Sequence, residues 1–207
     1  MRKLIVALTL ALSLPLSAEP VDQLASLLSG YERFSANFEQ FATSEQGERR
    51  EASSGNFAVA RPDRFVWNTL KPFPQQIISD GEYVWIYDED LEQATRKPGN
   101  QNTESAPALI LNGRIHELEM RYDVSLIQQT GNLMVFELLP KAGQDAMFTR
   151  VRLLFEDAVL SEFMLDDNLG QRSTILLSDT QLDPELDEAI FRFTPPDDID
   201  VILDEAP

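Results

Sequence analysis

The stretch that decides the fold runs from residue 55 to residue 93. It reads GNFAVARPDRFVWN (55–68), then three residues, then PFPQQIISDGEYVWIYDEDLEQ (72–93). Large apolar side chains recur at every second position, as Phe57, Phe65 and Trp67 illustrate, and this is the period of a β-strand. The stretch is therefore predicted to be β-structure with one aromatic face.

Two breaks divide this stretch into strands. Arg61-Pro62 separates the first two apolar runs, and Asp80-Gly81 is a strong hairpin signal between two others. The hairpin is predicted to pair residues 76–79 with residues 83–88.

The second strand of that hairpin is apolar on both faces. Tyr83, Trp85 and Tyr87 fall on one side, and Val84 and Ile86 fall on the other. A sheet of this kind needs a cover on each face, or a ligand on one of them.

The remainder of the chain predicts one mainly β domain with a few short helices. Residues 21–28 carry apolar side chains at helical spacing, residues 105–111 form a second helix, and residues 184–189 form a turn that Asp183 caps. Further strands are expected at 34–43, 121–130, 133–140, 149–156, 160–166 and 172–179.

The N-terminus has the three parts of a secretory signal peptide. Arg2 and Lys3 form a basic start, residues 4–16 are apolar but too short to span a bilayer, and the stretch ends in the small residue Ala18. A buried N-terminal helix is the alternative. We expect residues 1–18 to be removed and residues 19–207 to form a single domain that is not integrated in a membrane.

Composition narrows the classes of partner. The chain has no cysteine, so it forms no disulfide and carries no lipid on a cysteine. Its net charge of −18 makes nucleic acid a poor partner, because phosphates would be repelled. A basic protein partner suits this charge better, and solubility alone is the other interpretation.

No motif for catalysis or for metal binding is apparent. His116 is the only histidine, so histidine triads and zinc sites have almost nothing to draw on. Acidic pairs such as Asp166-Asp167 lack the spacing of a calcium loop and are expected on a solvated surface. The sequence predicts neither a catalytic residue nor a metal ligand.

Four motifs, in a fixed order along the chain, carry a resemblance to a known family. They are Arg61-Pro62-x-x-Phe65-x-Trp67, Ile78-Ser79-Asp80-Gly81 continuing to Trp85-x-Tyr87-Asp88, Leu91-Glu92-Gln93, and Phe191-x-Phe193-Thr194-Pro195-Pro196. Behind a signal peptide, this set resembles the LolA family of periplasmic carriers of outer-membrane lipoproteins. The similarity extends over nearly all of residues 19–207.

The resemblance implies a fold and a function. The fold is an unclosed antiparallel β-barrel, or half-barrel, with a helical lid over an apolar concave cavity. The function is to take triacylated lipoproteins from an inner-membrane ABC transporter, carry them through the periplasm as a monomer, and deliver them to an outer-membrane receptor. That receptor is itself a lipoprotein of the same fold, and the missing cysteine separates this chain from it. No cofactor is implied.

The acyl-chain cavity is expected to use aromatic side chains of the strands. Ordinary core packing is the alternative for each of them, and in such a fold the two roles overlap. The predicted cavity residues are Phe57, Phe65, Trp67, Trp85 and Tyr87.

The resemblance also implies a latch. Arg61 stands at the position that, in the family, hydrogen-bonds backbone carbonyls of the lid helix, and its guanidinium offers five donors in a fixed fork. The alternative is an exposed arginine paired with Asp63. The lid is assigned to residues 106–112, a plain core helix being the alternative, and comprises Pro107, Ala108, Leu109, Ile110 and Leu111.

Two other classes of function remain open. A lipid- or lipoprotein-sensing module could use the same half-barrel, although such a regulator is expected to bring a second domain or a membrane anchor. A secreted hydrolase on an antiparallel sheet is the third possibility.

Overall fold

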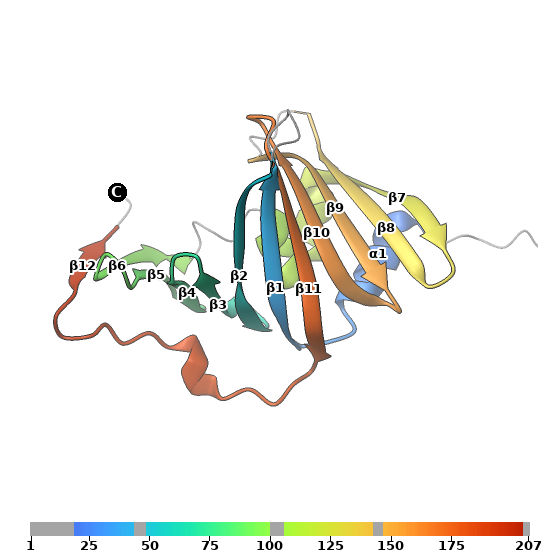
Figure 1. Ribbon diagram of the computed structural model, residues 1–207. Coiled ribbons are helices and arrows are strands. Elements are labelled where there is room, and N and C mark those ends of the chain that lie inside the picture. The colour runs from blue at the N-terminus through green and yellow to red at the C-terminus, as the bar shows by residue number, and fades with distance from the viewer. Residues whose placement is uncertain (1–18, 44–48, 100–105, 143–146, 205–207) are drawn as a thin grey trace, which may run out of the picture.

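The computed structural model describes residues 19–43, 49–99, 106–142 and 147–204, which form one curved sheet with helices inside its curve (Figure 1). The twelve strands of these residues are hydrogen-bonded in the order β12-β6-β5-β4-β3-β2-β1-β11-β10-β9-β8-β7. Their bounds are β1 Arg33–Thr43, β2 Arg49–Ala60, β3 Arg64–Lys71, β4 Gln75–Asp80, β5 Tyr83–Asp88, β6 Gln93–Pro98, β7 Tyr122–Thr130, β8 Leu133–Pro140, β9 Phe148–Glu156, β10 Val159–Asp167, β11 Arg172–Leu182 and β12 Asp200–Leu203.

The sheet consists of two antiparallel meanders, β1 to β6 and β7 to β11, which are joined by the antiparallel pair β1 and β11. Strand β12 adds to β6 in parallel. Because β7 and β12 stand at opposite ends of the strand order, the sheet does not close on itself. The predicted mainly β, unclosed fold is confirmed, with one parallel pair added.

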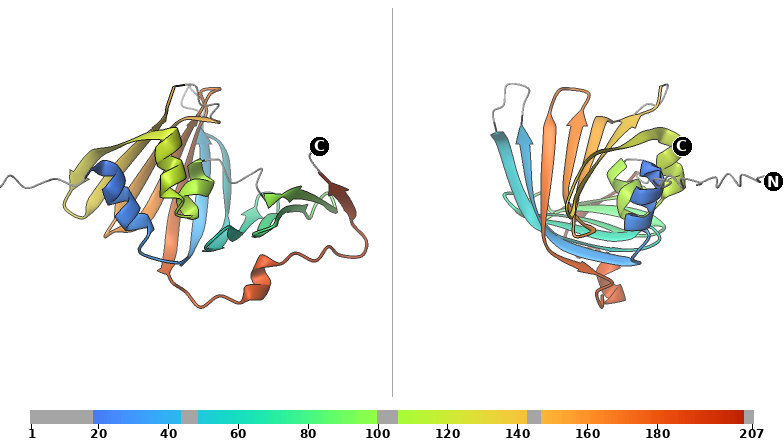
Figure 2. Two further views of the ribbon diagram at one scale, coloured as in Figure 1. Left: turned by 180° about the vertical axis from the view of Figure 1, so that it is seen from behind. Right: turned by 90° about the vertical axis from the view of Figure 1, so that its right-hand side faces the viewer.

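Three helices lie within the curve of the sheet: α1 Pro20–Leu28, α2 Ala106–Leu111 and α3 Ile115–Arg121 (Figure 2). They insert apolar side chains into one cluster with the phenylalanines of the strands. The helical residues with no exposed area in this cluster are Leu24, Leu28, Leu109, Ile110 and Leu118. Burial of this kind drives the helices onto the sheet. The sequence did not predict α3.

The outer, convex face is crossed by the segment that follows β11. It includes the short helix η2 Glu188–Phe191 and ends in β12. Phe191 is buried against Ala58, Val66 and Ile78 of the sheet. The segment is therefore a cover for the second apolar face.

The predicted turn at 184–189 is wrong in position and in its cap. The helical turn begins at Glu188, and the carboxylate of Asp187 accepts the backbone N–H of Ala189 at 2.9 Å. Asp183 instead accepts the backbone N–H groups of Glu32 and Arg33 at 2.8 and 2.9 Å. Its side chain ties the end of β11 to the start of β1, a long-range contact that local capping rules do not reveal.

The predicted signal peptide, residues 1–18, lies outside the described residues. Among the residues that are described, no helix has the length and apolar character needed to cross a membrane.

Candidate functional site

An aromatic cluster occupies the concave face where β1, β2 and β3 run side by side. Phe57 lies opposite Trp67 in the register of β2 and β3, and their rings stack with centroids 5.0 Å apart. Phe38 stacks on the same indole at 4.2 Å. Phe57 is only 3% exposed, whereas Phe65 and Trp67 are half-buried at the edge of the cluster. The structure therefore brings together three of the five predicted cavity residues.

Trp85 and Tyr87 lie on the other face. Their rings pack on Phe193 of the C-terminal segment, with centroids 5.2 and 5.3 Å apart. Trp85 is opposite Ile78, which belongs to the outer apolar cluster. Their assignment to the concave cavity is therefore corrected.

Register explains this difference. Trp67 pairs with Ile77, and Ile77 pairs with Ile86, so Ile86 is the residue of β5 that shares the face of Trp67. Alternation alone separates the two faces of β5 but does not say which face is concave.

Helix α2 forms the predicted lid segment and packs on the concave cluster. Leu109 and Ile110 have no exposed area, and Pro107, Ala108 and Leu111 are half-buried.

The helix closes with a left-handed glycine. Gly113 has a φ of +64°, its N–H donates to Ile110, and the N–H of Arg114 donates to Leu109. This is a Schellman C-cap, and it ends the helix at the end of the predicted lid segment.

Arg61 joins the ends of two helices to the sheet. Its Nε donates to the carbonyl of Leu111, at the end of α2, at 3.1 Å. Its Nη1 donates to the carbonyls of Leu28 and Tyr31, at and just beyond the end of α1, at 2.5 and 2.6 Å. One bond therefore reaches the end of α2 and two reach the end of α1. Because the guanidinium is half-buried and these carbonyls are left over at helix ends, the three bonds satisfy otherwise unpaired acceptors.

Asp63 does not pair with Arg61. Its carboxylate accepts two hydrogen bonds from Nη2 of Arg114, both at 2.6 Å, and its backbone N–H donates to Oδ1 of Asn112 at 3.2 Å. Residues 61–63 and 111–114 thus form a clasp between the start of β3 and the end of α2. Sequence reasoning missed Asn112 and Arg114 as members, because only their proximity to Asp63 in space marks them.

The clasp continues into the aromatic cluster through stacked rings. The guanidinium carbon of Arg61 lies 4.4 Å from the ring centre of Tyr31. Tyr31 stacks on Phe34 at 5.3 Å, and Phe34 contacts Phe57 at 5.5 Å. Burial raises the pKa of Tyr31, and the charge of Arg61 partly offsets this rise. The clasp and the aromatic cluster are therefore in continuous contact.

The surroundings supply apolar surface rather than reactive groups. His116 lies exposed on α3, away from the cluster. Over the described ranges, no group of three or more histidine, cysteine or acidic residues is arranged to hold a metal ion. If the helices moved off the concave cluster, its apolar side chains could bury apolar material in their place.

Comparison with known proteins agrees with this geometry. The sequence model of the family described as outer membrane lipoprotein carrier protein LolA matches residues 29–194. The chain is 35% identical to the outer-membrane lipoprotein carrier protein of Hahella chejuensis over 100% of this chain and 99% of that one. It is 38% identical to the protein of the same name from Chromobacterium violaceum, over 95% and 93% of the two chains.

Among solved structures, an uncharacterized conserved protein from Thermus thermophilus superimposes with a TM-score of 0.56 at 16% identity. The match covers 89% of this chain and 96% of that one. At this identity the likeness concerns the fold alone. The family model and the near full-length relatives carry the assignment: the chain belongs to the LolA family of outer membrane lipoprotein carrier proteins.

Proposed function

We propose that this protein carries lipoproteins through the periplasm by burying their acyl chains on its concave face. It receives them from an inner-membrane ABC transporter, works as a monomer, and hands them to an outer-membrane receptor lipoprotein. The observation that carries the proposal is the aromatic cluster of Phe57, Phe65 and Trp67 under a clasped helix, in a chain of this family.

The physical need for such a carrier follows from the cargo. Each CH₂ group of an acyl chain gains about 0.8 kcal/mol on leaving water, so long chains do not cross an aqueous space unescorted. Aromatic and aliphatic side chains offer broad contact without directional demands, which suits disordered chains. A catalytic pocket would require convergent polar groups instead.

Helix α2 fills the proposed acyl-chain site. Leu109 and Ile110 of the lid, with no exposed area, occupy the concave cluster that cargo would use. Cargo must therefore displace α2, and an open empty state would expose a large apolar patch to water. Arg61 favours the closed state through its bond to Leu111 and its two bonds at the end of α1.

The first test removes the latch with Arg61→Leu. Charge-assisted bonds contribute about 1.5–3 kcal/mol each, so the empty protein should shift towards the open form by roughly one to two orders of magnitude per bond. Since closure helps to expel cargo, the variant should accept lipoprotein and release it poorly. A two-step assay, release from inner membrane followed by handover to the receptor, measures both stages.

Arg64→Leu is the matched control. Arg64 lies three residues further along the chain. Its guanidinium pairs with the carboxylate of Glu188 on the outer face, rather than with the carbonyls at the ends of α1 and α2. The Arg64→Leu variant should load lipoprotein and hand it over as the wild type does. Normal handover by Arg61→Leu would contradict the latch role of Arg61. If Arg61→Leu instead failed to accept lipoprotein but handed it over normally, Arg61 would be needed for loading rather than for release.

The second test places a charge in the cluster with Phe65→Glu. A carboxylate among packed acyl chains costs several kcal/mol, so loading should be lost while the chain stays folded. Leu70→Glu is its control, because Leu70 is on the same strand and 57% exposed. Equal loading by Phe65→Glu and wild type would place Phe65 outside the acyl-chain site.

A further inference from the structure

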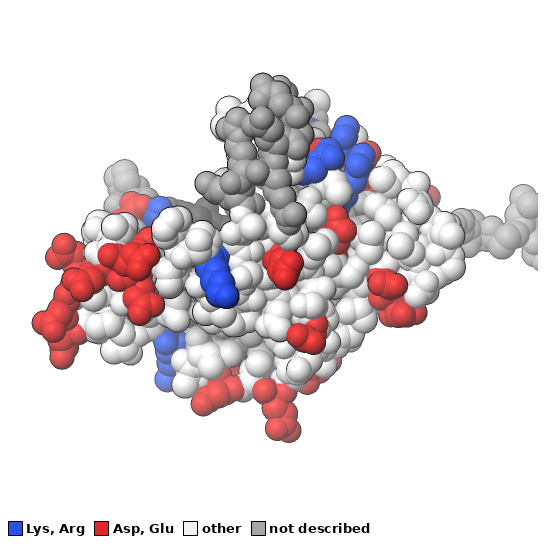
Figure 3. Space-filling view, viewed as in Figure 1, with Lys and Arg blue, Asp and Glu red and all other residues white. Residues whose placement is uncertain are grey.

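The convex face holds a cavity on the side of the sheet opposite the proposed acyl-chain site. It measures about 760 Å³ and lies between strands β1 to β5 and β11 on one side and residues 189–196 of the C-terminal segment on the other. In Figure 3 most of the surface over the centre of this face belongs to uncharged residues.

The floor of the cavity is a row of carboxamides. Asn37 on β1 opposes Asn56 on β2, Asn56 opposes Asn68 on β3, and Asn68 opposes Gln76 on β4. Adjacent strands are about 4.8 Å apart, so the four carboxamides repeat at that interval across the sheet. In the same register, Gln76 opposes Tyr87 on β5, which also lines the cavity.

These carboxamides keep hydrogen-bonding capacity for a ligand. Nδ2 of Asn37 donates to Asp179 at 2.8 Å, and Nδ2 of Asn68 donates to Oδ1 of Asn56 at 3.0 Å. Oδ1 of Asn68 is buried, and no donor of the described residues reaches it. That buried atom is not open to a ligand, whereas Asn37 and Gln76, at the two ends of the row, are exposed and can form hydrogen bonds with one.

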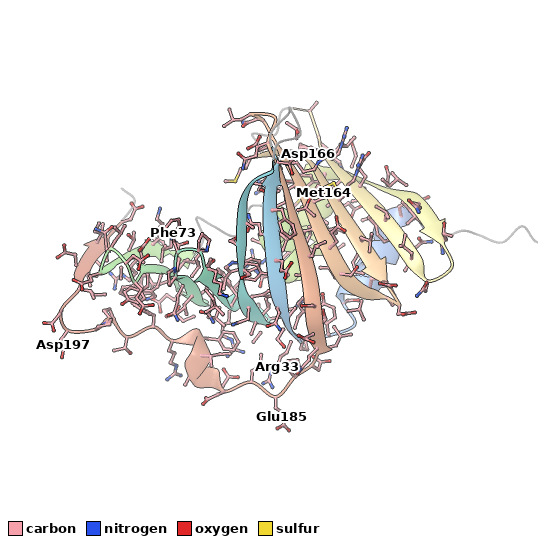
Figure 4. The ribbon with its side chains drawn as sticks, viewed as in Figure 1. Arg33, Phe73, Met164, Asp166, Glu185 and Asp197 are labelled. Carbon is pink, nitrogen blue, oxygen red and sulfur yellow. The ribbon has the colours of Figure 1, made fainter. Side chains whose placement is uncertain are left out.

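The walls add apolar surface and balanced charge. The rings of Tyr87 and Phe193 lie 5.3 Å apart at one end, and Ile78 lies in the floor. The charged side chains among the lining residues are one acid, Asp179, and one base, Arg192. Glu185 and Asp197 of the C-terminal segment point away from the sheet in Figure 4, and Glu188 of the same segment pairs with Arg64 of β3.

We propose that this cavity is a binding site for a neutral oligosaccharide of two or three hexose units. Each hydroxyl of a sugar both donates and accepts, as each carboxamide does, and the strand interval is close to the length of one hexose in a chain. The Tyr87 and Phe193 rings suit the apolar face of a sugar ring. A single cation, Arg192, is too few for a polyphosphate.

The geometry favours a sugar over an extended peptide. Strands β1 to β4 are interior, with a neighbour on each side, so their backbone groups cannot pair with an added strand. A peptide also advances about 3.3 Å per residue, which does not match the row.

Titration of the ¹⁵N-labelled protein with cellotriose, maltotriose and triacetylchitotriose tests the proposal. At least one sugar should shift the side-chain NH₂ signals of Asn56, Asn68 and Gln76 in a saturable manner. Gln76→Ala should weaken that binding about 2- to 10-fold, the effect of one lost hydrogen bond. Gln129→Ala, an exposed strand glutamine at the far edge on β7, should bind as wild type does.

Three results would overturn the proposal. One is that no trisaccharide shifts these signals at concentrations up to about 10 mM, a range that still detects weak binding. Another is that Gln76→Ala and Gln129→Ala bind equally. The third is that a Gly-Ser hexapeptide shifts the row while the sugars do not, which would make the cavity a peptide site. The experiment contains no lipoprotein, so its outcome is independent of the carrier proposal.

Discussion

Gly113 leaves no room for a side chain, because the guanidinium of Arg61 packs directly against it. A Cβ at this position would lie 2.8 Å from the guanidinium carbon of Arg61, and the φ of +64° is strained for any other residue. Gly113→Ala should therefore displace the guanidinium and cost about 1–2 kcal/mol of stability through the backbone alone.

The functional expectation for Gly113→Ala is the same as for Arg61→Leu, with the arginine still present. Lipoprotein should load but leave poorly in the two-step assay. If Gly113→Ala loses stability in urea as expected but hands over lipoprotein normally, the backbone strain acts on stability alone. The latch hypothesis would then be wrong.

Gly55 is required by a close approach of two backbones. A Cβ there would lie 1.8 Å from the carbonyl oxygen of Asn68 and 2.9 Å from the ring of Phe38. Gly55→Ala should lower the free energy of unfolding by at least about 2 kcal/mol, because backbone atoms must move. Urea denaturation measures this loss. Gly30→Ala, whose nearest neighbour is 3.7 Å away, should stay within about 0.5 kcal/mol of wild type.

Asp166 should make part of the stability depend on pH. Hydrogen bonds from Arg172, at 2.6 and 3.0 Å, lower the pKa of Asp166, although burial acts in the opposite direction. A carboxylate with a lowered folded-state pKa stabilises the protein above its unfolded pKa, about 3.9. That contribution is lost as pH falls through the folded-state value.

Asp166→Asn should therefore reduce stability at neutral pH by no more than about 1 kcal/mol, since Arg172 is exposed and solvent screens the pair. The difference from wild type should vanish on acidification. Urea unfolding between pH 3 and pH 7 checks this, and a constant difference across that range would contradict it.

At the level of elements, local signals served best where the determinant is local. The hairpin at Asp80-Gly81 and the helix expected at residues 105–111 are set by turn and cap chemistry, and both are present. Alternation separated the two faces of β5 but could not show which of them is concave. That depends on the pairing of Ile86 with Ile77, which alternation does not reveal. Helix α3 was missed because its ends carry no local signal: the side chain of its N-cap residue Arg114 makes no capping hydrogen bond, and its C-cap residue is the extended Tyr122.

The site residues also fall into those that a local motif predicts and those that only the fold reveals. The position of Arg61 followed from a motif, and its hydrogen bonds to helix ends fit that expectation in part. Asn112 and Arg114 join it only through contacts about 50 positions apart in sequence. Such contacts need the fold before they can be seen.

Strand β12 is an element with little burial, since all four of its residues are exposed. The N–H of Asp200 donates to the carbonyl of Glu92 at 2.9 Å, and Asp200→Pro would remove that donor. The cost in global stability should be below about 1 kcal/mol, while the amides of β6 should exchange with solvent much faster. Asp200→Ala keeps the N–H and is the control; unchanged exchange in Asp200→Pro would mean that β12 does not protect β6.

For the molecule as a whole, two faces of one sheet are covered in different ways. The concave face lies under three helices, of which α1 and α2 are held at their ends by Arg61, and the convex face lies under a segment that ends in an exposed strand. Acidic side chains gather at the end where that segment turns into β12, on the left of Figure 3. Partners of opposite charge would meet this end first.

The pairing of β1 with β11 also sets an order of events in time. Phe34 opposes Leu182, so the first strand of the sheet waits for a partner near the other end of the chain. Each meander can form from neighbouring strands as the chain appears, but pairing across so long a separation is slow. Until it happens, both halves carry an unpaired edge that invites association with other chains. The step that completes the sheet is then also the step that ends its exposure to aggregation.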